Sequence, residues 1–154
     1  YVGIAPGAGE KNKVWPINNF IEICRYLEAK NCILVFYLGP NEKQYEEVLK
    51  TNFQKAIFLE NELLLSKYNN IEIIMASTKF LKFAISNDSG VSHMLSTNHC
   101  PLVKLFGPKD SKKFTPKINN LITLSSSEVN SDRVEDIKVS RVIDIIEDMK
   151  FINV

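Results

Sequence analysis

The residues best suited to chemistry stand together in residues 87–93, which read Asn-Asp-Ser-Gly-Val-Ser-His. They follow an apolar run and begin a helical pattern, so their backbone N–H groups should point outward from a positive helix end. Such a helix end suits a phosphate or pyrophosphate. Ser89 would add a hydroxyl donor, Gly90 would let a ligand approach the backbone, and His93 lies about one turn further along. A purely structural alternative stays open, with Asp88 as the helix N-cap and a tight turn behind it.

A second candidate stretch is residues 6–16, a glycine-rich turn with the sequence Pro-Gly-Ala-Gly-Glu-Lys-Asn-Lys-Val-Trp-Pro. Lys13 could reach across a crevice to a phosphate as a point charge. We expect Trp15 to pack beneath this loop. The glycine spacing matches neither a P-loop nor the dinucleotide-binding fingerprint. Taken alone, Lys13 could equally be a solvated surface charge.

Two further loops follow apolar runs. Residues 38–42 end in Glu42, whose carboxylate could accept hydrogen bonds from ribose hydroxyls, as acidic residues do in dinucleotide-binding folds. Glu42 could instead favour the first turn of its own helix through the helix dipole. Residues 106–110 contain a Gly-Pro pair, for which we expect a structural role at the rim of a site.

The elements that position these loops alternate between strand-like and helix-like patterns. This alternation predicts right-handed βαβ units, hence an α/β fold with a doubly wound, parallel, Rossmann-like sheet. In such sheets ligands bind at the carboxyl ends of the strands, where the loops above would meet. We expect residues 125–136, which are polar and serine-rich, to form a loop. The expected strands are residues 1–4, 32–38, 56–59, 83–86, 102–106 and 121–124, and the expected helices are residues 17–30, 42–49, 71–76, 89–96 and 139–149.

Composition excludes several classes of function. The 154 residues include 19 basic and 18 acidic side chains, and only three of the basic ones are arginine, so a nucleic-acid partner is not expected. No apolar run is long enough to span a bilayer. The three cysteines lack metal-site spacing, and Cys24 and Cys32 are expected to be small buried hydrophobes. We expect no metal and no cofactor.

The order and spacing of these loops resemble glycosyltransferase family 9, which includes the ADP-heptose:lipopolysaccharide heptosyltransferases. The resemblance rests on Pro-Gly-Ala-Gly with Lys-x-Trp-Pro, then Asn-Asp-Ser-Gly-x-x-His, then Phe-Gly-Pro, and runs from about residue 3 to residue 110. It implies a GT-B architecture, of which residues 1–154 would be the single nucleotide-sugar-binding domain, the C-terminal half. The N-terminal acceptor domain, with the catalytic base, would be absent from this chain.

The resemblance also implies roles for individual residues. Lys13 would contact the donor phosphates and Glu42 the ribose. The diphosphate and the donor sugar would be surrounded by Asp88, Ser89, Gly90 and His93. The implied reaction is an inverting, metal-independent transfer of a sugar from a nucleotide-sugar donor, an ADP-heptose or similar ADP-sugar, to a lipid-linked glycan acceptor. It would take place in the cytoplasm, at the inner membrane of a bacterium.

Three positions depart from the family pattern. Val14 stands where an arginine is common, and residues 99–100 replace a glycine-containing turn. Lys104 interrupts an apolar strand, which suggests that this strand is less covered than its neighbours. Two alternatives to the transferase stay open, a non-catalytic nucleotide-binding module and a GT-B-type sugar-nucleotide epimerase.

Overall fold

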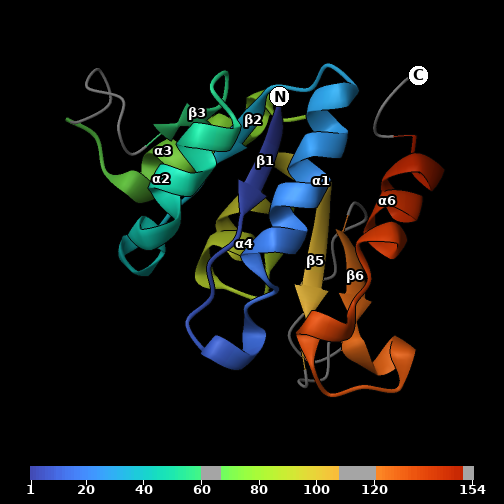
Figure 1. Cartoon of the computed structure of the whole chain (residues 1–154). Coiled ribbons are helices and arrows are strands. Elements are labelled where there is room, and N and C mark those ends of the chain that lie inside the picture. Colours follow the sequence, from blue (N-terminus) through green and yellow to red (C-terminus); the bar gives the residue numbers. More distant parts are fainter. Residues whose placement is uncertain (60–66, 108–120, 151–154) are drawn as a thin grey trace.

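The computed structural model describes residues 1–59, 67–107 and 121–150, which form an α/β fold around one six-stranded sheet (Figure 1). Every strand pairs in parallel with its neighbours, in the order β3-β2-β1-β4-β5-β6. The structure therefore confirms the predicted doubly wound parallel sheet. The strands are β1 Val2–Ala5, β2 Leu34–Phe36, β3 Ile57–Phe58, β4 Phe83–Asn87, β5 Leu102–Phe106 and β6 Leu121–Ser125.

The strand order reverses between β1 and β4, which lie side by side at the centre of the sheet. Ala5, the last residue of β1, is in register with Ser86 near the end of β4. The loops after these two strands diverge from one point, and in open α/β sheets this is where ligands bind. Residues 87–93 and the glycine-rich loop after β1 both begin there.

Helices cover both faces of the sheet. One face packs against α1 Ile17–Ala29, α2 Lys43–Asn52 and α6 Val139–Asp148, and the other against α3 Asn70–Ser77 and α4 Gly90–Leu95 (Figure 1). Alternate residues of β4 point to opposite layers: Phe83 and Ile85 join the first core, and Ala84 joins the second. Burial on both faces explains the continuous apolar runs of the strands.

Short 3-10 turns connect several elements and shape the loops at the ends of the strands. Residues 125–136, predicted to be a loop, contain two of these turns, and their buried Ser126 and Val134 anchor the segment. The turns are η1 Lys11–Lys13, η2 Pro40–Glu42, η5 Thr78–Phe80, η6 Thr97–His99, η7 Ser126–Val129 and η8 Val134–Asp136.

The remaining helices and strands lie at the predicted positions, with bounds that differ by a few residues. All three cysteines are free thiols, and Cys24 is fully buried as expected. Cys32 is only half-buried, because it precedes β2 at the edge of the core instead of lying inside a strand. Among the described helices, none has the length and apolar content that crossing a membrane would require.

Candidate functional site

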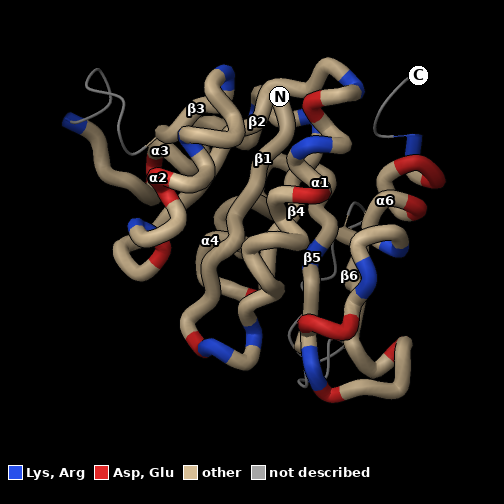
Figure 2. The backbone as a smooth tube through the Cα atoms, viewed as in Figure 1, with Lys and Arg blue, Asp and Glu red and all other residues tan. Residues whose placement is uncertain are grey.

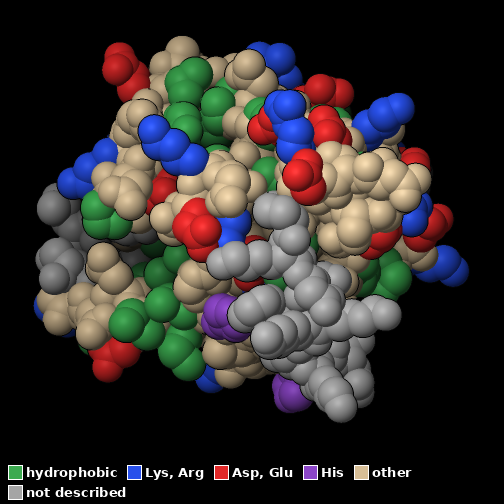
Figure 3. Space-filling model, turned by 90° about the horizontal axis from the view of Figure 1, so that it is seen from below, with side chains coloured by type: hydrophobic (Ala, Val, Ile, Leu, Met, Phe, Trp, Pro, Cys, Tyr) green, Lys and Arg blue, Asp and Glu red, His purple; other side chains and the backbone are tan. Residues whose placement is uncertain are grey.

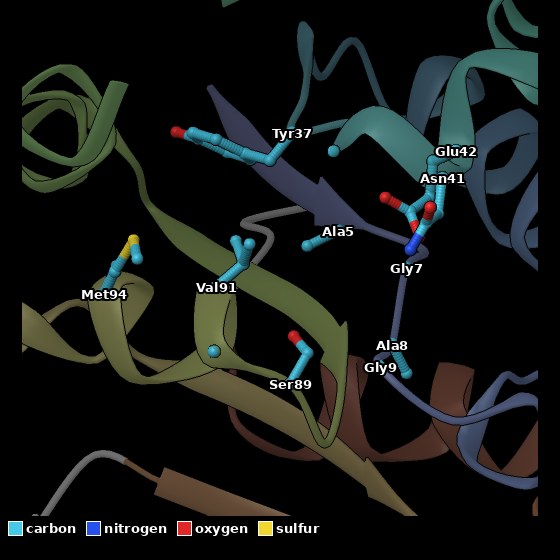
Figure 4. A pocket seen from close by; sticks show the side chains of 12 residues that line it. Ala5, Gly7, Ala8, Gly9, Tyr37, Asn41, Glu42, Ser89, Val91 and Met94 are labelled. Atoms are coloured by element: carbon cyan, nitrogen blue, oxygen red, sulfur yellow. The ribbon is translucent and has the colours of Figure 1, made fainter. Parts of the chain in front are cut away.

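A pocket of about 260 Å³ opens at the carboxyl ends of the central strands. Three segments line it: residues 5–9 after β1, residues 37–42 after β2, and residues 89–94 at the start of α4 (Figure 4). The pocket lies beside the reversal of strand order. Chain topology therefore brings together three loops that are far apart in sequence.

The start of α4 forms one wall of this pocket. Ser89, not Asp88, is the N-cap: its Oγ accepts a hydrogen bond from the backbone N–H of Ser92 at 3.3 Å. The Ser92 hydroxyl donates in turn to the Ser89 carbonyl at 2.6 Å. A Cβ placed on Gly90 would meet no heavy atom within 4 Å, so the space in front of this helix end is open. The expectation that Asp88 is the N-cap is therefore wrong, since Ser89 caps the helix.

Asp88 lies instead between two lysines. Its Oδ1 is 2.7 Å from Lys104 Nζ and its Oδ2 is 3.5 Å from Lys13 Nζ. Lys13 also forms an ion pair with Glu10 at 3.0 Å. The ammonium of Lys13 therefore lies beside the end of β4, where a contact with a phosphate is expected. In this structure its ion-pair partners are carboxylates of the protein.

Lys104 corrects an expectation from the sequence. We expected its strand to be less covered than its neighbours, but all five residues of β5 are buried and Lys104 is only 1% exposed. The lysine is accommodated inside the protein because Asp88 supplies a counter-charge and the ring of Phe106 lies 4.7 Å from Nζ. In the sequence, Lys104 stands out as a charge within an apolar strand, and this pattern alone does not assign it to the site.

His93 lies on the exposed side of α4. Its pKa is lowered by partial burial of the ring and by the positive charge of Lys104, and the negative charge of Asp88 opposes this shift. A lowered pKa favours the neutral imidazole, which has one donor and one acceptor nitrogen. His93 is therefore suited to hydrogen bonding with sugar hydroxyls or with a phosphate oxygen.

Asn87 fixes the glycine-rich loop to the end of β4. Its Nδ2 donates to the carbonyl of Pro6 at 2.7 Å, and its Oδ1 accepts from the backbone N–H of Trp15 at 3.2 Å. Trp15 is fully buried, as predicted, and its Nε1 donates to the Ile137 carbonyl at 2.9 Å. In the sequence, Asn87 belongs to residues 87–93, but its residue type alone indicates no role. A polar residue that ends a buried strand was the available signal.

Glu42 lies at the opposite side of the pocket, at the end of η2 (Figure 4). A Cβ on Gly7 would be 2.4 Å from Glu42 Cδ, and a Cβ on Gly39 would be 2.6 Å from Glu42 Oε2. The carboxylate therefore occupies space that exists only because both neighbours are glycine. Within the described residues it forms neither an ion pair nor a hydrogen bond, so its oxygens are available to a ligand.

The predicted site residues thus divide into two groups. Ser89, Gly90 and Glu42 line the pocket itself. Lys13, Asp88 and His93 belong to a charged group next to it. In the loop after β5, Gly107 packs closely on the loop after β1, since its Cβ would be 3.0 Å from the Asn12 carbonyl, in line with a structural role. Residues 108–110 of the same loop lie outside the described residues.

The wider face of the sheet's carboxyl ends shows basic and acidic side chains interspersed, not gathered into one basic patch (Figure 3). In the part of the chain that the structure describes, no three His, Cys, Asp or Glu side chains are grouped as metal ligands would be. The charged residue that lines the pocket itself is Glu42, and the lysines and carboxylates around Asp88 lie next to the pocket.

The comparisons with known proteins agree on one family. The family described as glycosyltransferase family 9 (heptosyltransferase) matches residues 1–141. Lipopolysaccharide heptosyltransferase 1 of Campylobacter coli is 26% identical over 132 residues, which cover 84% of this chain and 38% of that protein. Lipopolysaccharide heptosyltransferase 2 of Escherichia coli is 27% identical over 122 residues, which cover 77% of this chain and 34% of that protein. The chain thus spans little more than a third of these curated relatives.

Solved structures agree on the fold. The E. coli heptosyltransferase WaaC with ADP superposes with a TM-score of 0.81, at 18% identity, over 96% of this chain and 43% of that one. A glycosyltransferase of family 9 from Veillonella parvula gives a TM-score of 0.79 at 21% identity. The match covers 96% of this chain and 45% of that one. These likenesses confirm the Rossmann-like half of a GT-B fold. With nearly the whole chain matched by the family, the protein belongs to glycosyltransferase family 9.

Proposed function

We propose that this chain binds the nucleotide-sugar donor of a glycosyltransferase, and that this donor is an ADP-heptose or a similar ADP-sugar. The transfer would be inverting and metal-independent. It would belong to the synthesis of the lipopolysaccharide core or of a related surface glycan. Family membership supports the reaction class. Solved structures of the fold neighbour WaaC with ADP and with ADP-2-deoxy-2-fluoro heptose support the donor class. The acceptor would be a lipid-linked glycan at the cytoplasmic face of the inner membrane. It would be bound by an N-terminal domain that also supplies the catalytic base.

One observation carries the proposal. A single pocket at the reversal of strand order combines the open start of α4, at Ser89 and Gly90, with the carboxylate of Glu42. The N–H groups of a helix start bind anions, and a carboxylate binds vicinal hydroxyls. Together they match the two polar parts of a nucleoside diphosphate, its phosphates and its ribose.

The diphosphate would lie against Ser89 and Gly90, with Lys13 nearby. Gly90 leaves the necessary open space, and the Ser89 hydroxyl still has its hydrogen to donate while its oxygen caps α4. In the transfer reaction the nucleoside diphosphate leaves with additional negative charge. The helix start and Lys13 would stabilise that charge without a metal ion.

The ribose would lie against Glu42, in the space left by Gly7 and Gly39. Asp88 and His93 would then be on the side of the transferred sugar, where a carboxylate and a neutral imidazole can hydrogen-bond to hydroxyls. The proposed N-terminal domain would supply the acceptor site and the catalytic base, so we expect residues 1–154 by themselves to bind the donor without turnover.

The test is a titration of the chain with ADP and with UDP, each with and without magnesium, followed by backbone amide NMR shifts. We expect saturable, ADP-selective, magnesium-independent shifts at Ser89, Gly90 and His93. An absence of saturable shifts at these amides would contradict the proposal and favour a non-catalytic module.

A matched pair of variants sharpens the test. Lys13→Met should weaken ADP binding by about tenfold, the scale of one lost charge contact. Lys11→Met removes the same charge from the same turn, but Lys11 is exposed and makes no ion pair in the described structure. Its ADP affinity should stay within about twofold of wild type. Equal losses in both variants would indicate a general effect of net charge and not a contact.

A further inference from the structure

The outer side of α3 is apolar although this helix lies at the surface of the protein. Ile71 and Met75, which are one turn apart, are 49% and 39% exposed. Ile74 is the buried residue of the helix, and Glu72 is its one charged residue (Figure 2). A helix that is apolar on several sides is typical of an element enclosed by protein or by lipid. In α2, on the other face of the sheet, most residues are instead polar or charged.

A hollow beside α3 extends this apolar surface. Its volume is about 610 Å³, and two of the residues that line it are Tyr68, before the helix, and Phe80, after it. These two aromatic side chains are 52% and 72% exposed. The other described residues that line the hollow are Leu59, Glu72, Ile73, Ala76 and Ser77. Exposed apolar surface gathered in this way marks a contact with another surface.

The charges around α3 are mostly positive. Residues 67–82 contain one acidic residue and three lysines, which are Lys67, Lys79 and Lys82. All three lysines are exposed, and they stand before and after the helix, not on it. Lys67 Nζ lies 5.2 Å from the ring centre of Tyr68, so a cation and an aromatic ring stand together at the rim of the hollow. The acidic residue, Glu72, belongs to the capping box of α3.

We propose that the α3 face, defined by Tyr68, Ile71, Met75, Phe80 and the three lysines, docks on the surface of an anionic lipid bilayer. Apolar and aromatic side chains of such a face enter the boundary between headgroups and acyl chains. Lysines at its rim are attracted to the negative surface of the membrane. This positive rim is the reason to assign the face to lipid and not to a second copy of the chain, which would carry the same charges.

The inference goes beyond the proposed function, because the α3 face is separate from the nucleotide pocket. No residue of α3 is among the described residues that line the pocket. The helix packs on one face of the sheet, whereas the pocket opens at the carboxyl ends of the strands, so docking would leave the pocket open. A chain docked in this way would hold its donor close to a lipid-linked acceptor in the same bilayer.

The experiment measures co-sedimentation of the chain with vesicles of phosphatidylcholine alone and of phosphatidylcholine mixed with phosphatidylglycerol. We expect binding to the anionic vesicles to be at least about tenfold tighter, since three lysines contribute. Phe80→Ser should weaken this binding about tenfold, because a large apolar contact is lost. Lys79→Gln should weaken it about fivefold, the effect of one lysine near an anionic surface. Both side chains are exposed, and urea unfolding checks that the variants fold.

Helix α2 supplies matched controls on the opposite face of the sheet. Val48→Ser removes an apolar side chain that is 40% exposed, close to the exposed fraction of Met75. Lys43→Gln removes an exposed lysine and changes the net charge as Lys79→Gln does. Both controls should bind the anionic vesicles within about twofold of wild type, since attraction to the membrane falls off within a Debye length.

Unchanged vesicle affinity in Phe80→Ser or in Lys79→Gln would overturn the inference, and so would equal losses in the two α2 variants. Absence of wild-type binding to the anionic vesicles would also overturn it. Self-association in sedimentation velocity without lipid, if Phe80→Ser abolished it, would assign the face to a second copy instead. ADP affinity should stay at the wild-type value in all four variants. Failure of the wild-type chain to bind ADP would reject the proposed function and leave the vesicle result in place.

Discussion

The side chain of Asn87 accepts a hydrogen bond from the backbone N–H of Trp15 at 3.2 Å, across 72 residues of sequence. Its amide nitrogen donates to the Pro6 carbonyl at 2.7 Å. One fully buried side chain at the end of β4 thus holds both ends of the loop that forms part of the pocket. The geometry of residues 6–15 depends on a residue that does not itself line the pocket.

Replacing Asn87 with alanine should therefore affect both stability and binding. Asn87→Ala leaves a buried N–H and a buried carbonyl without partners, and each such group costs about 1–3 kcal/mol. We expect the free energy of unfolding to fall by about 2–4 kcal/mol in urea titrations, and ADP affinity to fall with it. The control is Asn18→Ala on the exposed side of α1, which should change stability by less than about 0.5 kcal/mol. Equal stability of the two variants would contradict this role of Asn87.

The contact between Gly7 and Glu42 predicts a small change in stability together with a larger loss of ADP affinity. In Gly7→Ala the new Cβ would overlap the Glu42 carboxylate, which lies at the flexible end of its side chain and can move away. We expect a stability change of at most about 1 kcal/mol, but a loss of ADP affinity of about tenfold as Glu42 leaves its place. Calorimetry and urea unfolding measure the two quantities separately.

Gly9→Ala is the matched control for the stability measurement. Gly9 belongs to the same loop, but a Cβ there meets nothing within 4 Å, and no glycine in the described structure has a positive φ. Its free energy of unfolding should be unchanged or slightly raised. Wild-type ADP affinity in Gly7→Ala would show that the position of Glu42 does not matter for binding.

The fold was predictable because its signals are local. The run of residues 102–106 gave the bounds of β5, and the spacing of apolar residues gave α1 to within one residue at its end. Alternation of the two patterns was then sufficient for a parallel sheet. The 3-10 turns in residues 125–136 were missed, because polar composition does not distinguish a turn anchored by a buried serine from an open loop.

The sequence predicted candidate site residues that the structure brings close together, but it did not predict the contacts between them. Spacing identified Lys13 and Asp88, yet it could not show that Lys104 lies on the other side of the same carboxylate. The partners of Asn87 lie 72 and 81 residues away, and periodicity contains no information on such distant pairs. The pairing of β4 with β1 and β5 brings these groups together.

Gly90 provides a prediction in which stability and binding change in opposite directions. The residue is at the start of α4, its φ is not positive, and a Cβ would meet no atom within 4 Å. Gly90→Ala should therefore stabilise the fold by up to about 1 kcal/mol through lower entropy of the unfolded chain. The same methyl group would project into the space proposed for the diphosphate. We expect ADP affinity to fall by about tenfold or more, measured by calorimetry. Tighter or unchanged ADP binding would place the phosphates elsewhere.

The pKa of His93 predicts how stability depends on pH. Its pKa in the folded chain is lowered from 6.5 by partial burial and by Lys104, so the unfolded chain binds a proton more readily than the folded one. The contribution of His93 to stability is therefore fully present above about pH 6.5. It is lost as pH falls from there through the lowered pKa, and His93→Gln should remove this part of the slope in urea unfolding.

The two charges next to His93 test the cause of its shift, by NMR titration of the imidazole. Lys104→Met removes a cation that disfavours the imidazolium, so the pKa of His93 should rise. Asp88→Asn removes an anion that favours the imidazolium, so the pKa should fall further. Opposite shifts in the two variants would show that the charges around Asp88 act on the ligand side of α4. Identical pKa values in both variants and in wild type would mean that burial alone sets the protonation of His93.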